Sequence, residues 1–577
     1  MGSVNVTIDG RAVTAEMGQT ILEAAQAAGI DIPTLCHHPG LEPAGMCRMC
    51  LVEVEKLRTL QTACTFQVSD GMVVHTESEK VVAARKSVLQ MLLSERNHFC
   101  MYCQLSGDCE LQRLAYRYGL DSWLYPRSYP PMPVDASRDY FVMDHGRCIL
   151  CRRCVRACTE LVGNCTLAMG WRGGDSIIVA DTDVPFGSSS CISCGTCLEM
   201  CPTGALMDRR SAYRGTEEDV ERVKSVCAAC SLGCGVELVT RNNQLLRIDG
   251  DWDADVNRGV LCVAGRFEPL FDDRQRVVTP LARRGGKFEE VTWEEALETV
   301  AARFKAIGGD ALVALASPRA TNEELNLFVS LFTRLGVTSI RSLRSVPEFM
   351  VDPEGSLASL DEADLFLVVG ADLEADHQVA GIAIRRGVIN RGARLVIVGG
   401  DWVGWDQRAG LAHDQFERDE IEQAIALARG ADRPVVIYGA MAGDLLSKLR
   451  EELSDQAQFL GLVPGSNARG ALAAGLDGSF DSEQVKGVFI LAADDEVDSA
   501  LLDELDGAEF VVAQASYFGP LVQRADVVLP TAIWAEKTGT FVNTEGRSQT
   551  LKAVLRAPEG VKNDQEILQA LAKRLAD

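Results

Sequence analysis

The sequence predicts a multidomain chain, with cysteine-rich α+β domains in its first half and α/β domains in its second half. At about 150 residues a domain, a length of 577 residues favours several domains. All 20 cysteines lie between Cys36 and Cys262. From about Val277 onward, apolar strands alternate with amphipathic helices, which is the pattern of parallel α/β sheets.

Composition and charge narrow the class of protein. The formal net charge is -25. Binding to phosphates needs a basic face, so we expect no nucleic-acid partner. The first residues, MGSVNVTIDG, lack the basic head and apolar run of a secretory signal, and no stretch offers the roughly 18 apolar residues of a membrane span. We therefore expect a cytoplasmic protein, in a reducing compartment where grouped cysteines bind metal.

Residues 1–78 predict a ferredoxin-like β-grasp domain. Hydrophobicity alternates over residues 4–16 around the turn dipeptide Asp9-Gly10, which indicates a hairpin, and a helix is expected from Ile21. Gly45 lets the backbone fold tightly before the second cysteine. The expected [2Fe-2S] ligands have the spacing Cys-x10-Cys-x2-Cys-x13-Cys and are Cys36, Cys47, Cys50 and Cys64. A zinc ribbon is the alternative, but it rarely has ten residues between its first two cysteines.

Residues 79–142 predict a second cluster domain, which begins with a charged amphipathic helix over 79–96. The cysteines that follow supply three thiolates where a [4Fe-4S] cluster needs four ligands. We predict His98 as the fourth ligand, the alternative being a surface or capping histidine. Cys165 is another candidate, expected instead to be a buried structural cysteine. The three thiolates are Cys100, Cys103 and Cys109.

Residues 120–142, rich in proline and aromatic residues, predict an ordered connector with packed rings.

Residues 143–215 contain two runs of the form Cys-x2-Cys-x2-Cys-x3-Cys. Each run holds a [4Fe-4S] cluster, and the fourth cysteine of each run ligates the other cluster. A zinc site is the alternative, but zinc usually takes two spaced pairs. The crossed assignment gives one cluster to Cys148, Cys151, Cys154 and Cys201. It gives the other to Cys191, Cys194, Cys197 and Cys158.

Residues 216–275 predict a further [4Fe-4S] domain, with short strands joined at Asn242-Asn243. Its ligands, spaced Cys-x2-Cys-x3-Cys-x27-Cys, are Cys227, Cys230, Cys234 and Cys262. The total expected is one [2Fe-2S] and four [4Fe-4S] clusters. In the α/β region, residues 276–577, no strand is followed by G-x-G-x-x-G, and the glycines of VIVGGDWVG have the wrong spacing. We therefore expect no NAD or FMN site on this chain.

The order of motifs resembles the large iron–sulfur subunit of respiratory complex I and of NAD-linked hydrogenases and formate dehydrogenases. The resemblance is carried by the [2Fe-2S] segment, the His–Cys segment with GDCELQ, and RCILCRRCVRAC. The part after Cys227 resembles the molybdopterin oxidoreductases, through VVTPLARRGGKFEEVTWEEALE, ATNEE and ADVVLPTAIWAEKTGTFVNTEGRSQ. In that family the fold holds a pterin-bound metal beside the cluster.

Several departures from these families bear on the expected cofactors. Ala264 stands where active molybdopterin enzymes usually carry a lysine, and no cysteine follows Cys262 to ligate molybdenum or tungsten, although serine or aspartate can substitute. No counterpart of the carboxyl-terminal pterin-binding barrel is recognised, so we expect a truncated scaffold without molybdopterin. His98 and Cys100 are separated by one residue, where the complex I family usually has three. Both complete cysteine runs are kept, where the complex I subunit normally keeps one.

The resemblance implies an electron-transfer subunit of an NAD(P)-linked oxidoreductase complex, with no complete catalytic site of its own. Its expected partners are a flavoprotein subunit that oxidises NAD(P)H, a small [2Fe-2S] subunit, and a second redox partner. That second partner would be a nickel–iron hydrogenase or a ferredoxin-coupled bifurcating module. The alternatives are the large subunit of respiratory NADH:quinone oxidoreductase, a formate dehydrogenase subunit with bound molybdopterin, and a scaffold whose clusters only stabilise the fold.

Overall fold

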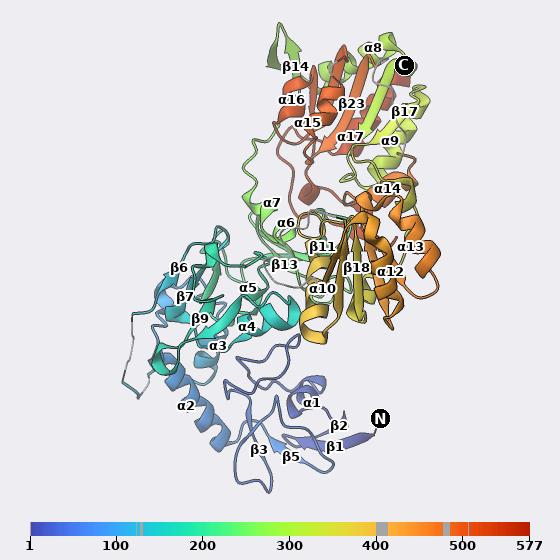
Figure 1. Cartoon of the computed structure of the whole chain (residues 1–577). Helices are drawn as coiled ribbons and strands as arrows, with labels where there is room; N and C mark the ends of the chain where they lie inside the picture. Colours follow the sequence, from blue (N-terminus) through green and yellow to red (C-terminus); the bar gives the residue numbers. More distant parts are fainter. Residues whose placement is uncertain are drawn as a thin grey trace. The chain divides into compact units, whose positions relative to one another are not determined.

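The computed structural model describes residues 2–122, 124–126, 131–399, 413–476, 485–505 and 507–576. The chain divides into two compact units, Met1–Val220 and Glu221–Asp577 (Figure 1). The division lies close to the boundary expected after residue 215, and the other domain boundaries stay predictions. Most of the VIVGGDWVG segment lies outside the described residues.

The first unit begins with a five-stranded sheet in the order β2-β1-β5-β3-β4. Asp9 and Gly10 both have positive φ, 48° and 79°, which makes the primed turn expected for a two-residue hairpin loop. Helix α1 begins at Ile21 and is capped by Thr20, whose hydroxyl and backbone form a capping box with Glu23. The hairpin and the helix confirm the sequence prediction. The elements are β1 (Ser3–Ile8), β2 (Arg11–Glu16), α1 (Ile21–Ala27), β3 (Leu51–Val54), β4 (Gln61–Thr62) and β5 (Val73–His75).

The rest of the first unit consists of short elements around the cysteine loops. Helix α2 confirms that a helix forms where one was predicted, but its buried residues include polar Arg85 and Ser94 beside Val81 and Leu89. The fully buried Arg85 donates to Leu51 O and to the hydroxyl of Tyr118, both at 2.7 Å. The elements are α2 (Glu79–Glu95), α3 (Glu110–Arg117), β6 (Val134–Asp135), β7 (Phe141–Asp144), α4 (Arg153–Arg156), β8 (Leu167–Gly170), β9 (Ile177–Ala180), α5 (Thr196–Met200) and β10 (Leu206–Asp208).

The connector over residues 120–142 differs in part from its prediction. Leu124 and Tyr125 are exposed, so the expected packing of this stretch is wrong at these two residues. Phe141 is buried and packs edge-on against Phe186, with ring centroids 5.5 Å apart. Proline removes backbone donors and prevents regular structure, but it does not by itself supply a surface for neighbouring rings to pack on. Trp123 and residues 127–130 lie outside the described residues.

The second unit opens with an antiparallel sheet in the order β11-β12-β13. Asn242 and Asn243 have φ of 51° and 59° and form the predicted turn. Two short helices follow. The elements are β11 (Glu221–Val226), β12 (Gly235–Arg241), β13 (Gln244–Gly250), α6 (Val263–Arg266) and α7 (Glu268–Phe271).

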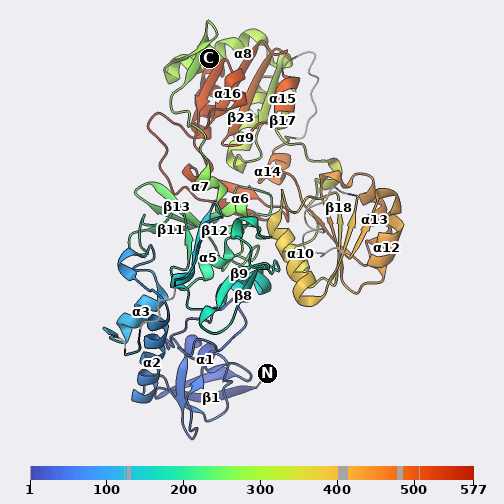
Figure 2. The same cartoon turned by 60° about the vertical axis from the view of Figure 1, so that its left-hand side comes forward.

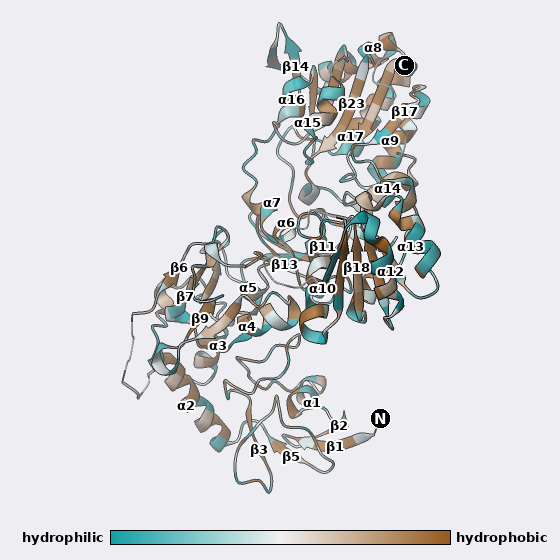
Figure 3. Ribbon diagram, in the orientation of Figure 1, coloured by the Kyte–Doolittle hydropathy of each residue, from teal (hydrophilic) through white to brown (hydrophobic). Residues whose placement is uncertain are grey.

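A seven-stranded sheet forms the larger α/β part, in the order β15-β14-β25-β24-β23-β16-β17. Its strands from β25 to β17 are parallel, as predicted, and β14 and β15 add an antiparallel edge. The inner strands β16 and β23 are apolar and buried along their length (Figure 3). The elements are β14 (Leu281–Arg284), β15 (Lys287–Glu290), α8 (Trp293–Ile307), β16 (Leu312–Ala316), α9 (Asn322–Arg334), β17 (Ser339–Ser342), α14 (Ala468–Ala473), β23 (Gly487–Ala493), α15 (Ser499–Glu504), β24 (Phe510–Ala515), α16 (Pro520–Arg524), β25 (Val527–Pro530), β26 (Gly539–Val542), β27 (Ser548–Leu551) and α17 (Asp564–Ala576).

A five-stranded parallel sheet, in the order β20-β19-β18-β21-β22, is built from the chain between β17 and β23. Helix α10 covers one face, and α12 and α13 cover the other (Figure 2). The sequence alternation predicted β18, β19 and β21 but not the short strands β20 and β22, and it did not divide the strands between two sheets. The elements are β18 (Leu365–Val369), α10 (Gln378–Arg391), β19 (Arg394–Val398), β20 (Asp414–Phe416), α12 (Ile421–Arg429), β21 (Pro434–Tyr438), α13 (Leu445–Leu453) and β22 (Gln458–Gly461).

A buried ion network ties α9, α17 and the segment before β26 together. The ammonium of Lys537 donates to Glu324 at 3.1 Å and to Asp564 at 3.0 Å, and all three side chains are at most 2% exposed. Glu324 also accepts the backbone N–H of Thr321, and Asp564 accepts the Thr531 hydroxyl. Because its members are held by several charge-assisted hydrogen bonds, the network joins three segments that are far apart in sequence.

We expect Lys537→Met to destabilise the second unit by about 3–5 kcal/mol, because it leaves two buried carboxylates without their cation. Calorimetric unfolding of the full chain measures the effect. Lys448→Met is the matched control: its partner Glu422 lies 2.6 Å away, but both side chains are exposed, so the loss is at most about 1 kcal/mol. Equal losses in the two variants would contradict the assignment of a buried network.

Candidate iron–sulfur cluster sites

The four cysteines of the first domain lie together in two pairs. The backbone N–H groups of Cys36 and Cys47 each donate to the other's sulfur at 3.4 Å. The sulfurs of Cys50 and Cys64 are 3.4 Å apart. Gly45 has φ of 61°, and its N–H points to the Cys64 sulfur. Two pairs of thiols from neighbouring loops fit a cluster of two irons, each of which needs two protein ligands.

The two cysteine runs of the first unit cross over in the structure. Cys148, Cys151, Cys154 and Cys201 line one cavity, together with Met143, Ile178 and Leu206. Cys158, Cys191, Cys194 and Cys197 line a second cavity, with Val162, Leu167 and Phe186. The groups are those that the spacing predicts, since the fourth cysteine of each run joins the other run's set. The ligation itself stays a prediction.

The two runs share a backbone conformation that turns amide groups toward sulfur. Leu150 and Ser193, each two residues after the first cysteine of a run, have φ of 52° and 54°. Their N–H groups donate to Cys148 and Cys191, in each case at 3.4 Å. Amide hydrogen bonds to sulfur stabilise negative charge on a cluster and its thiolates. Cys158 lies in a π-helical turn, Ala157–Leu161, of the kind that often marks functional sites.

The His98 imidazole is arranged as a neutral ligand would be. Burial lowers its pKa to about 4, so the ring is uncharged near neutral pH, and one ring nitrogen donates to the backbone of Leu92. The other, Nε2, is buried and has no hydrogen-bond partner among the described residues. A neutral histidine whose Nδ1–H is held by a carbonyl presents its Nε2 lone pair to a metal.

The cysteines that follow His98 lie against the loop after Cys201. The Cys109 sulfur is 3.7 Å from Pro202 O. A Cβ placed on Gly204 would lie 2.6 Å from the Cys103 sulfur, so this site needs glycine. The third cysteine, Cys100, is half-buried beside them. The His–Cys set and the Cys148 set are therefore neighbours, joined through residues 201–204.

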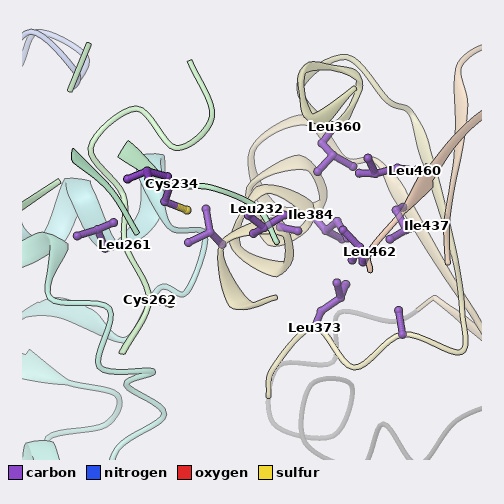
Figure 4. Close-up of a cluster of buried hydrophobic side chains, with 14 of the residues drawn as sticks. Leu232, Cys234, Leu261, Cys262, Leu360, Leu373, Ile384, Ile437, Leu460 and Leu462 are labelled. Carbon is purple, nitrogen blue, oxygen red and sulfur yellow. The ribbon is translucent and has the colours of Figure 1, made fainter. Parts of the chain in front are cut away.

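The last set, Cys227, Cys230, Cys234 and Cys262, lies between the small sheet and the α/β part of the second unit. A Cβ on Gly265 would lie 3.2 Å from the Cys227 sulfur and 3.6 Å from that of Cys262, so these thiols meet there. Cys234 and Cys262 share a buried core with the five-stranded sheet and α10, through residues such as Leu360 and Ile384 (Figure 4).

The β26–β27 hairpin holds the loop between Cys230 and Cys234. Three consecutive backbone carbonyls, at residues 231–233, accept the Thr544 N–H at 2.7 Å, Asn543 Nδ2 at 3.3 Å and Gln549 Nε2 at 2.7 Å. The Ser231 hydroxyl contacts Nε2 of the buried His377 at 3.0 Å. The loop is thus bound through its backbone, which fixes where the thiols point.

In the first domain, hydrogen bonds within the two thiol pairs dominate the pKa shifts of the four cysteines. In the other sets burial dominates. It raises the pKa of Cys148 and of Cys109 to about 11, and that of Cys262 to about 12. Cys36 is different, because a hydrogen bond from Cys47 lowers its pKa to about 5. A buried thiol releases its proton only when a cation replaces it, so these sets favour metal binding.

Cys165 differs from its prediction. It is exposed and has φ of 53°, so the expectation of a buried structural cysteine is wrong. Its turn conformation beside Cys158, whose carbonyl its N–H approaches at 3.4 Å, leads the side chain outward. Within the described ranges, no three His, Cys, Asp or Glu side chains converge on a single metal ion. Ligands of a four-iron cluster each bind a different iron and need not meet at one point.

Profiles of known families match the chain from end to end. The 2Fe-2S iron-sulfur cluster binding domain matches residues 2–79, and the NADH-ubiquinone oxidoreductase-G iron-sulfur binding region matches 85–122. The ferredoxin-like domain of NADH-quinone oxidoreductase subunit 3 matches 139–207. The molybdopterin oxidoreductase Fe4S4 domain and the molybdopterin oxidoreductase family match 220–269, and 276–439 with 454–574.

The mitochondrial NADH-ubiquinone oxidoreductase 78 kDa subunit of Candida albicans is 30% identical, over 100% of this chain and 83% of the relative. The chain belongs to the family of large iron–sulfur subunits of NADH-quinone oxidoreductases. An NADH-quinone oxidoreductase subunit of Rhizobium meliloti is also 30% identical, over 95% of this chain and 77% of that relative. A crystal structure of an NAD+-reducing [NiFe]-hydrogenase is 37% identical to this iron–sulfur subunit, covering 37% of it and 91% of the hydrogenase chain, with a TM-score of 0.36.

The predicted family is therefore confirmed, as are [2Fe-2S]- and [4Fe-4S]-binding domains followed by molybdopterin oxidoreductase-like α/β domains. This iron–sulfur subunit is related to subunits of oxidoreductase complexes. Among its described helices, none combines the length and the apolarity that a membrane crossing requires. Spacing did not reveal the contacts of Gly204, Gly265 and His377, since each depends on segments distant in sequence.

We expect Gly204→Ala to displace the Cys103 sulfur and to cost the subunit one cluster, or about four irons per chain. Iron analysis and electron paramagnetic resonance of the reduced chain measure the loss. Gly174→Ala is the control, because a Cβ there meets no atom within 4 Å. Full iron content in the Gly204 variant would show that Cys103 is not a ligand.

Proposed function

We propose that this chain carries electrons, one at a time, between a flavoprotein subunit that oxidises NAD(P)H and a second redox partner. The observation that carries the proposal is the gathering of buried thiols into neighbouring sets, with Cys103 and Cys109 packed against the loop that follows Cys201. The membership of the chain in the NADH-quinone oxidoreductase family supports it. Neighbouring sets of this kind can form an electron-transfer chain, because electrons move efficiently only between closely spaced centres.

We propose a complement of one [2Fe-2S] and four [4Fe-4S] clusters, which when bound supply one-electron redox centres. The ligands are the cysteine sets named above, with His98 completing the set of Cys100, Cys103 and Cys109. The buried Nε2 of His98, which has no hydrogen-bond partner in the part of the chain that the structure describes, supports this role.

The chain's own residues control charge and water at these sites. Burial excludes water from the sulfurs, and the N–H groups of Leu150, Ser193 and Gly265 donate to thiolates at 3.3–3.4 Å. Both factors act on the relative stability of the oxidised and reduced states. No residue is assigned to substrate or proton chemistry, and we propose that neither molybdopterin, FMN nor NAD binds this chain.

The proposal also concerns the identity of the second redox partner. Two complete cysteine runs, whose crossed sets line two cavities, favour a nickel–iron hydrogenase or a ferredoxin-coupled bifurcating module. The relatives favour respiratory quinone reduction as the second candidate. A small [2Fe-2S] subunit beside the flavoprotein is part of either assembly.

Purification of the assembled complex through a tag on this chain tests the partners. We expect an NAD(P)H-oxidising flavoprotein to co-purify, and NAD(P)H to reduce the clusters. Nickel with hydrogen uptake would support the first candidate, whereas membrane subunits with quinone reduction would support the second. Molybdenum or tungsten near one per chain, or clusters that NAD(P)H leaves oxidised, would overturn the proposal.

His98→Ala should remove one cluster from the full chain, lowering the iron content from about 18 to about 14 atoms. His98→Cys should keep the iron but lower that cluster's reduction potential, because histidine ligation raises it in Rieske centres. Iron analysis and redox titration followed by electron paramagnetic resonance give both readouts. His75→Ala is the control, since His75 is exposed and pairs with Glu55. An unchanged potential and iron content in both His98 variants would exclude ligation by His98.

A further inference from the structure

A cationic side chain from the seven-stranded sheet reaches the cluster site of the second unit. Arg319 lines one cavity together with Cys227, Ala264, Gly265 and Trp534. Ala264 and Gly265 carry no charge, so the guanidinium supplies positive charge on this side of Cys227. Its side chain is 21% exposed, as expected for a cavity wall.

Two loops at one edge of the sheet hold Arg319 in place. Strands β16 and β23 are parallel neighbours, so the residues that follow them meet at their carboxyl ends. Arg319 Nη2 donates to Asp494 at 2.7 Å, and its backbone N–H donates to the Ser317 hydroxyl at 3.0 Å. Ser317 in turn donates to Asp495 at 2.6 Å. These hydrogen bonds fix both the backbone and the guanidinium of Arg319, so the positive charge is held in one position.

The contacts of Arg319 leave part of its hydrogen-bonding capacity unused. Its Nε is buried without a hydrogen-bond partner among the described residues, and so is Oδ1 of Asp494. Two carboxylates add negative potential at the same cysteine set, since Asp376 raises the pKa of Cys230 and Glu268 raises that of Cys262. In contrast to these carboxylates, Arg319 is a cation, and its charge acts on Cys227.

We propose that the fixed positive charge of Arg319 raises the reduction potential of one cluster. The ligands of this cluster are Cys227, Cys230, Cys234 and Cys262. This inference rests on the cluster assignment of the proposed function. Reduction adds one electron to the cluster, and no bond forms or breaks. The added negative charge is stabilised by a fixed cation in a partly buried site, where electrostatic interactions are stronger than in water.

Redox titration of the full chain, followed by electron paramagnetic resonance, tests the role of Arg319. The signal of this cluster is first identified by its loss in Cys262→Ala. In Arg319→Gln we expect the equilibrium constant for reduction of this cluster alone to fall by about tenfold, a shift of about 59 mV for one electron. In Arg319→Lys we expect the potential to stay close to that of the unmodified chain, because the positive charge is kept.

Arg344→Gln is the matched control. Arg344 pairs with Asp495 at 3.2 Å but is 49% exposed and does not line the cavity, so we expect no shift. An Arg319→Gln chain with full iron content and an unchanged potential overturns the inference, as does an equal shift in the Arg344 control.

A second variant covers the case in which Arg319→Gln loses the cluster. Asp494→Asn removes the carboxylate that neutralises Arg319, so we expect the potential to rise rather than fall. A fall or no change would overturn the inference. Absence of any Cys262-dependent signal in the unmodified chain would instead refute the cluster assignment, so failure of the proposed function is distinguishable from failure of this inference.

Discussion

The first unit depends on the burial of sulfur. Its cysteine sets lie in cavities lined by apolar side chains, and burial raises the pKa of most of their thiols. A desolvated thiolate is stable only beside a cation or amide donors, and metal binding then contributes directly to folding. The helices that carry these cysteines are short: α4 has four residues and α5 has five. Elements of this length do not form stably by themselves, so the clusters are expected to organise the loops around them.

Local backbone geometry explains why spacing was so informative here. In both runs of the first unit, a positive-φ residue between cysteines turns an amide toward sulfur, at Leu150 in one and Ser193 in the other. Because the same short loop is used twice, the same spacing appears twice. The grouping of Cys201 with the first run and Cys158 with the second could be predicted because the fourth cysteine of such a run joins the other cluster. The Asp9-Gly10 and Asn242-Asn243 turns were predictable in the same way, since each requires positive φ at both residues.

Features set by distant contacts were not predictable from one sequence. The need for glycine at residue 204 arises from Cys103, and the position of Arg319 arises from Asp494 on a neighbouring strand's loop. No local pattern marks either contact. The exposure of Cys165 and of Tyr125 was missed because residue type alone does not determine burial. The unpaired Nε2 of His98 likewise becomes visible only when burial and partners are known.

The α/β part of the second unit has a use that does not require a pterin cofactor. Three consecutive carbonyls of the Cys230–Cys234 loop are bound by Asn543, Thr544 and Gln549, which lie in the region that matches the molybdopterin oxidoreductase family. His377 binds the same loop, and Arg319 lines the cavity beside Cys227. Each contact orients a thiol-bearing loop or supplies charge near it. The α/β part therefore has a structural role at the Cys227 set that these contacts explain without reference to a pterin.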